Sequence, residues 1–166
     1  MSGLTWDDLE HSLGLHLASM PADAIFTLYV AEAERPGFDP VFDGYPRYVQ
    51  FLAYDDAVRC EVVSNTYLPP ELQHSVDDLI ALRLDGWTLP TDEHVSGSPN
   101  IFLDVPATEG AVAAAMTMRV FREVWHVADA GGVTCDAEDL RGRHAFRVLS
   151  APADFRAGAP LQCQDQ

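Results

Sequence analysis

The sequence predicts a single α+β domain, with a mainly antiparallel, five-stranded sheet and helices packed against it. Two patterns support this prediction. Residues 46–65 alternate between apolar and polar side chains, as in a β-hairpin, whereas three longer stretches show the apolar spacing of amphipathic helices. The chain has 166 residues, 48% of them apolar, which is enough for one sizeable core. The expected order is helix, three strands, helix, two strands, helix.

The hairpin is the centre of this prediction. Asp55 and Asp56 form its natural two-residue turn, because Asp tolerates the backbone conformations that tight turns need. That register places six apolar side chains on one face, in the pairs Ala53–Val58, Phe51–Cys60 and Val49–Val62. The other face carries Tyr48, Gln50, Leu52, Tyr54, Ala57, Arg59, Glu61 and Val63. The first face is predicted to be core. The second is either covered by a helix or a contact surface.

The first helix is expected to begin after Thr5 and to end before Pro21. Thr5 with Asp8 matches a capping box, in which each side chain bonds to the backbone of the other residue. A strand follows over residues 24–32, with Phe26, Leu28 and Val30 on one face. Ile25, Thr27 and Tyr29 alternate with them. Residues 33–45 then form a loop that is too apolar for a solvated linker.

The second helix is expected to begin after Ser75, which Asp78 complements as a capping box, and to end at Gly86. Its apolar members are Val76, Leu79, Ile80 and Leu84. Residues 87–89 and 100–105 are the two further strands of the predicted sheet.

The third helix is predicted over residues 108–128 and has an unusually wide apolar arc. Val112, Ala113, Met116, Val120, Val124 and Val127 form one stripe, which Met118, Phe121 and Trp125 extend. Such an arc indicates contacts from more than one side. The second contact is expected from either the C-terminal segment or another subunit.

The chain is predicted to divide near Asp129. Residues 1–128 form the α+β domain, and residues 129–166 form a C-terminal extension. The extension is expected to add one helical turn near its start and to dock through Phe146, Val148 and Leu149. Its last ten or so residues are expected to be disordered.

Charge and composition narrow the functional classes. The net charge is −16, and all ten basic residues are arginine, so phosphate backbones are repelled and nucleic-acid binding is not expected. The charge favours either solubility alone or recognition of a basic partner. No apolar run approaches the length of a membrane helix. A secretory signal begins with basic residues, and residues 1–12 include none. We therefore expect a cytoplasmic protein that does not bind membranes.

The chain shows no recognisable catalytic, metal or cofactor motif. Residues 39–50 resemble a calcium loop only in part, because Val41 and Gln50 replace required oxygen ligands. The six histidines form no HExxH motif and are expected at the surface. Cys60, Cys135 and Cys163 share no motif spacing. We expect no enzyme activity, no metal and no cofactor.

Several stretches of the chain are similar to one known group of proteins. They are WDDLEHSLGLHLASM, PRYVQFLAYDDAVRCEVVSN, LRLDGWTLP, the strand that begins at Asn100, and MRVFREVW. Together with the order of elements, they resemble class I type III secretion chaperones and YbjN-type proteins, whose actinobacterial members are called TY-Chap domains. The resemblance covers about residues 4–128. It implies a secretion-chaperone-like fold that often dimerises and holds extended polypeptide on its surface.

These observations together predict a non-enzymatic, chaperone-like module that binds a polypeptide client, basic or disordered, and forms a homodimer. Two alternatives stay open: a regulatory or scaffold homodimerisation domain without a client, and a small enzyme with a composite site. The residues predicted to bind peptide or form an interface combine aromatic, apolar and arginine side chains, which suit such surfaces. They are Tyr48, Leu52, Tyr54, Arg59, Val63, Phe121 and Trp125.

Overall fold

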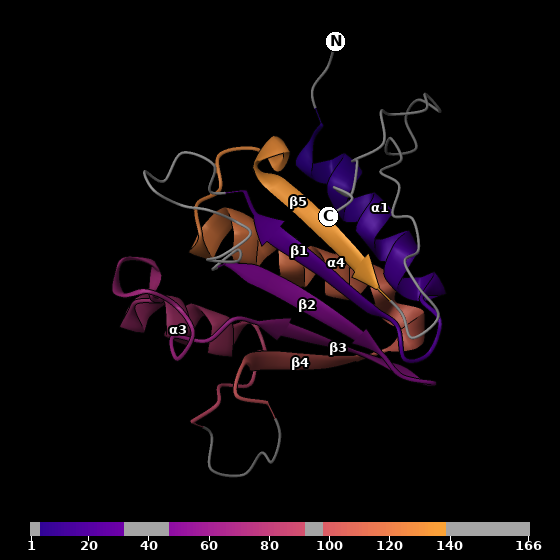
Figure 1. Cartoon of the computed structure of the whole chain (residues 1–166), viewed down its shortest axis with the longest axis horizontal. Coiled ribbons are helices and arrows are strands. Elements are labelled where there is room, and N and C mark those ends of the chain that lie inside the picture. The colour runs from indigo at the N-terminus through magenta and orange to yellow at the C-terminus, as the bar shows by residue number, and fades with distance from the viewer. Residues whose placement is uncertain (1–3, 32–46, 92–97, 139–166) are drawn as a thin grey trace.

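The fold is a five-stranded antiparallel sheet with two helices on one face and a third helix at its end (Figure 1). It is seen in a computed structural model, which describes residues 4–31, 47–91 and 98–138. The sheet order is β4-β3-β2-β1-β5. The main elements are α1 (Trp6–Ser19), β1 (Ile25–Val30), β2 (Tyr48–Ala53), β3 (Ala57–Val62), α3 (Val76–Leu84), β4 (Ile101–Pro106), α4 (Gly110–Arg119) and β5 (Val133–Glu138). The predicted α+β class with an antiparallel five-stranded sheet is confirmed.

The predicted hairpin register is confirmed. β2 and β3 pair Val49 with Val62, Phe51 with Cys60 and Ala53 with Val58, and all six side chains are buried. The backbone N–H of Tyr54 donates to the carbonyl of Ala57, which closes the hairpin around the predicted Asp turn. A buried face of period two fixes this register, because a one-residue slip would expose every core side chain.

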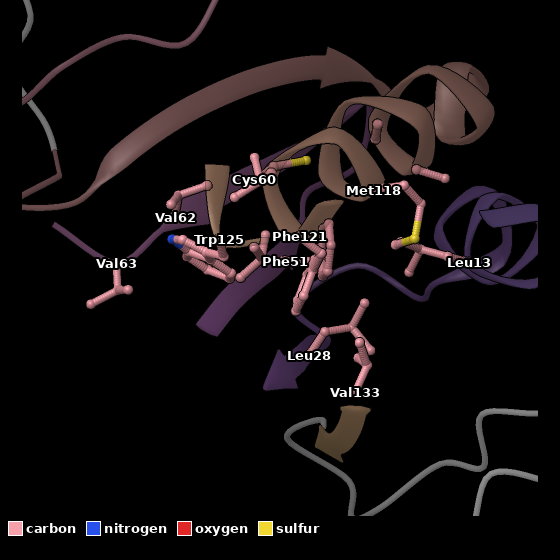
Figure 2. Close-up of a cluster of buried hydrophobic side chains, with 14 of the residues drawn as sticks. Leu13, Leu28, Phe51, Cys60, Val62, Val63, Met118, Phe121, Trp125 and Val133 are labelled. Carbon is pink, nitrogen blue, oxygen red and sulfur yellow. The ribbon is translucent and has the colours of Figure 1, made fainter. Parts of the chain in front are cut away.

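The core lies between the sheet and a helical layer formed by α1 and α4, which lie behind the sheet in Figure 1. Phe51, Phe121, Leu28 and Met118 meet there (Figure 2). The two helices cross closely at Gly110. A Cβ on that residue would lie 2.5 Å from the carbonyl oxygen of Gly14. Much of the apolar arc predicted for the third helix is buried within the chain, at Ala113, Met118, Val120, Phe121 and Trp125, whereas Val112 is 47% exposed.

The fifth strand is not the predicted one. Residues 87–89 form only a single bridge, in which Thr88 exchanges two backbone hydrogen bonds with Phe102. The fifth strand is instead β5, which follows a short 3₁₀ turn at Ala130–Gly132 and pairs with β1 from Val133 to Glu138. It lies beyond residue 128, the predicted domain boundary. The predicted order ended with a helix, whereas in the structure β5 follows that helix.

Both predicted capping boxes are confirmed, and they fix where α1 and α3 begin. Thr5 and Asp8 bond reciprocally at α1, and Ser75 and Asp78 do so at α3. Gly86 ends α3 with a φ of 99°, a conformation that glycine adopts without steric cost. No helix in the described part of the chain is long and apolar enough to cross a membrane.

Candidate functional site

The sheet has one face that no helix among the described residues covers, and it is turned towards the viewer in Figure 1. We call it the open face. By strand alternation it carries Ile25, Thr27 and Tyr29 of β1, Tyr48, Gln50 and Leu52 of β2, Arg59 and Glu61 of β3, Phe102 and Asp104 of β4, and Thr134 of β5. It thus includes four of the predicted site residues: Tyr48, Leu52 and Arg59, with Tyr54 directly after β2.

An ion pair organises the β4 side of the open face. The guanidinium of Arg59 donates two hydrogen bonds of 2.8 Å to the carboxylate of Asp104, a bidentate geometry that fixes both side chains. The same guanidinium lies 4.5 Å from the centre of the Phe102 ring and covers it. Arg59 therefore presents a fixed planar group rather than a mobile charge.

A polar network lies at the end of the open face nearest α3. The amide of Asn100 donates to the Tyr48 hydroxyl at 3.3 Å and to the Glu61 carboxylate at 3.4 Å. The Tyr48 ring also packs beside that of Tyr29, with 6.4 Å between their centres. Burial raises the pKa of the Tyr48 phenol, so the ring stays neutral. Tyr48 is therefore held in place and only half-exposed.

The opposite end of the open face is apolar. Ile25 and Leu52 are opposite each other on β1 and β2. Tyr54 lies two residues after Leu52 and therefore on the same face. Ile25 is 39% exposed and Tyr54 is 47% exposed. We call these three residues the hairpin-end patch. Three exposed aspartates lie beside it in the chain, Asp23, Asp55 and Asp56. An apolar patch with an acidic border suits a basic and apolar ligand.

Three predicted site residues are buried instead of exposed: Val63, Phe121 and Trp125 (Figure 2). Val63 lies beyond the end of β3, where hairpin alternation no longer places side chains on the open face. Phe121 and Trp125 belong to a π-helical segment, Val120–Val124, and its end, where their rings meet edge to face at 5.0 Å. All three are part of the core, so an accessible surface does not include them.

Trp125 is held by a buried hydrogen bond to a histidine. Its indole N–H donates to Nε2 of His74 at 2.9 Å, and Nδ1 of His74 lies 3.0 Å from Oδ1 of Asn65. An indole can only donate, so Nε2 of His74 carries no proton. Burial lowers the pKa of His74; nearby Asp78 raises it, and Arg47 lowers it further. The prediction that the histidines lie at the surface is wrong for His74.

Helix α3 carries a second exposed apolar surface, formed by three of the four apolar members named from the sequence. Val76 is 73% exposed, Ile80 51% and Leu84 82%. These residues are four apart and lie on one side of the helix. We call them the α3 stripe. The helix packs through Leu82, which was not among those apolar members, with Leu79 partly buried beside the core.

The described residues contain no cluster of three or more acidic, histidine or cysteine side chains that could hold a metal ion. Cys60 lies in the core, and burial raises the pKa of its thiol to about 12, so it stays protonated and unreactive. The partial calcium motif of residues 39–50 and the loop of residues 33–45 fall largely outside the described residues. The same applies to His94, His144 and Cys163.

Comparison with known proteins agrees with this arrangement. Neither the curated proteins nor the solved structures include a significant match to the chain. A family model matches residues 3–139, which include every described strand and helix. This chain belongs to the TY-Chap3 family, described as type III secretion system (YopN, CesT) and YbjN peptide-binding chaperone 3.

Proposed function

We propose that this protein is a cytoplasmic, non-enzymatic, chaperone-like module that holds an extended segment of a client polypeptide on the open face of its sheet. The observation that supports this most directly is the hairpin-end patch, where Ile25, Leu52 and Tyr54 leave apolar surface exposed on a sheet face without a described helix. Membership of a family of peptide-binding chaperones supports the same class of function.

The proposed contacts are side-chain pockets and one strand edge. Apolar client side chains pack on the hairpin-end patch, and the fixed Arg59–Asp104 pair offers a polar border beside it. The proposed edge for backbone bonds is that of β5, which is the last described strand on its side of the sheet. The matching edge of β4 is partly occupied by Thr88. Extended peptides commonly bind by combining such an edge with pockets for alternate side chains.

The proposed client is basic as well as apolar. The whole chain carries a net charge of −16, and Asp23, Asp55 and Asp56 lie next to the hairpin-end patch. Complementary charge raises the rate of encounter and excludes acidic competitors. A disordered client fits best, because an unfolded segment can extend over the sheet without unfolding first.

The test is the double variant Leu52→Ser/Tyr54→Ser. The probes are labelled twelve-residue peptides that combine arginine with large apolar residues, and binding is followed by fluorescence anisotropy. Loss of interface anchors weakens binding by about 2 kcal/mol or more, which is roughly thirtyfold in Kd. Surface substitutions change stability by only about 0.5 kcal/mol each.

The matched control is Val112→Ser, because Val112 is as exposed as Tyr54 but lies on α4, in the layer behind the sheet. It should leave peptide binding unchanged. If the double variant binds peptide as tightly as the unmodified protein, the client site is not the open face. If the double variant unfolds, the hairpin-end patch is part of the core.

A second role, homodimerisation, is favoured by the α3 stripe. A two-fold axis through Ile80, with the two copies of α3 antiparallel, places Val76 against Leu84 of the partner subunit. Apolar surface thus meets apolar surface, as a self-complementary interface requires. This contact differs from the predicted one through the apolar arc of the third helix, much of which is buried within the chain.

A further inference from the structure

The charge of this chain is distributed unevenly. Residues 1–138 contain 23 acidic and 6 basic residues, a net charge of −17, whereas residues 139–166 contain 3 acidic and 4 basic residues, a net charge of +1. The basic side chains concentrate in residues 140–149, LRGRHAFRVL, which include three arginines and no acidic residue. Four large apolar residues lie among them. This segment therefore has the composition that we propose for a client.

The chain enters this segment beside the hairpin-end patch. The last residue of β5, Glu138, pairs with Ile25 of β1, and Ile25 pairs with Leu52 of β2. These three residues form one row across the sheet. With strands about 4.8 Å apart, Leu52 lies roughly 10 Å from Glu138. At about 3.3 Å per residue, Phe146 can extend up to roughly 26 Å from Glu138. The segment is thus attached within reach of the whole patch.

The basic and apolar residues of the segment 140–149 complement the acidic and apolar residues at the hairpin-end patch. The hairpin-end patch exposes Ile25, Leu52 and Tyr54, and the aspartates next to it are Asp23, Asp55 and Asp56. The α3 stripe is a poorer match in position, because it lies beyond the opposite end of the strands (Figure 1). Attachment through a short tether also raises the effective concentration of a segment at a nearby site to about the millimolar range.

We propose that residues 140–149 bind the hairpin-end patch of their own chain and compete with the client. This inference rests on the proposed function, because it assigns an internal occupant to the same surface. A client must then displace the segment, so the protein discriminates against weakly bound polypeptides. Substituting the segment's arginines lowers its own affinity for the patch and leaves the surface itself unchanged.

The first test is photocrosslinking in the full chain. A benzoylphenylalanine replaces Tyr54, so one aromatic group substitutes for another. A second protein carries the probe in place of Val112 as the control. Irradiation of an equal mixture of ¹⁵N-labelled and unlabelled protein, followed by peptide mapping, identifies the crosslinked partner. We expect crosslinks from position 54 to residues 140–149 within one chain, and none from position 112 to that segment. Crosslinks that miss the segment, or that join labelled to unlabelled chains, would overturn the proposal.

The second test measures competition. The triple variant Arg141→Ser, Arg143→Ser, Arg147→Ser should bind the labelled basic peptides about tenfold more tightly than the unmodified chain, because an occupied site weakens apparent affinity by its occupied fraction. Equal affinities, with no crosslink, would reject the internal occupant and leave the proposed function intact. A crosslink without peptide binding by either protein would support the internal occupant and reject the proposed function.

Discussion

The stability of the fold is expected to depend strongly on the buried side chain of Phe51. It is fully buried at the centre of the sheet, 5.9 Å from Phe26 between ring centres. Phe51→Ala is expected to destabilise the protein by about 3–5 kcal/mol, because the vacated volume is only partly refilled. Urea unfolding measures the change, with Tyr54→Ala as an exposed control that should cost far less. A loss below about 1 kcal/mol for Phe51→Ala would show that this face is not the core.

His74 should make the stability of the fold depend on pH. Its Nε2 accepts a hydrogen bond from the indole N–H of Trp125. Protonation of Nε2 would place two N–H donors face to face in the core and break that bond. Burial lowers the pKa of His74 in the folded state below the ordinary value of 6.5. The unfolded chain therefore binds the proton more readily. The stability contributed by neutral His74 is fully present above about pH 6.5 and is lost as the pH falls below that value.

A histidine variant tests this pH dependence. Unfolding free energy measured between pH 5 and 7 should fall with acid by up to about 1.4 kcal/mol per pH unit from this one group. His74→Gln should reduce that slope, because it removes the titrating imidazole and keeps a polar side chain at the site. If the slope of the His74→Gln variant equals that of the unmodified protein, the histidine contributes no proton linkage to folding.

Among the elements, the crossing of α1 and α4 depends on two glycines to different degrees. A Cβ at Gly110 would lie 2.5 Å from the Gly14 oxygen and 2.8 Å from the Ala18 nitrogen, and backbone atoms cannot move aside independently. A Cβ at Gly14 would lie no closer than 3.2 Å to its nearest neighbour, the Ala111 Cα. Gly110→Ala should therefore be destabilising by roughly 1–3 kcal/mol, as overpacking usually is.

Gly14→Ala is the matched control for that crossing. Gly14 lies inside α1, where alanine gains up to about 1 kcal/mol of helix propensity, whereas Gly110 is the first residue of α4 and gains less. A loss of stability at Gly110 beyond that difference reports the contact between the helices. Thermal or urea unfolding of the two variants gives this difference. Equal stabilities would mean that the helices separate without cost and that their close approach is not required.

The same elements show which features a sequence can predict. The hairpin register and both capping boxes depend on neighbours a few residues away. The alternation of side chains and the spacing of the cap residues are therefore sufficient to predict them. β5 has the alternating pattern of Val133, Cys135 and Ala137, which a strand requires, but its partner β1 lies more than a hundred residues earlier. The orientation of α3 depends on tertiary packing. Its apolar residues lie on both sides, and only the fold selects Leu82 for the core.

The candidate surface was likewise predictable only in part. Alternation placed Tyr48, Leu52, Tyr54 and Arg59 on one face, and that face lies away from α1 and α4. It did not predict that Arg59 would pair with Asp104, since β4 joins the sheet from a distant part of the chain. Nor did it exclude Phe121 and Trp125, because an apolar helix face has the same spacing whether it contacts the core or a partner.

At the scale of the whole molecule, the α3 stripe predicts a homodimer at micromolar concentrations. Exposed apolar side chains that repeat along one helix face are a common interaction surface. Because the proposed two-fold axis passes through Ile80, this residue meets its own copy. Ile80→Asp or Ile80→Arg should each leave the protein monomeric, since like charges would be forced together. Ile80 is half-exposed, so neither change should unfold the chain.

Mixing the two variants is the decisive step, because a self-contact makes them complementary. An equal mixture of Ile80→Asp and Ile80→Arg should form a heterodimer, in which each acid meets a base across the axis. Sedimentation velocity at about physiological salt distinguishes the three samples, and Val112→Asp, on exposed α4 surface, should remain dimeric. Monomers in the mixture, with dimers of the unmodified protein, would place the interface elsewhere than at α3. A monomeric unmodified protein across the whole concentration range would exclude the homodimer.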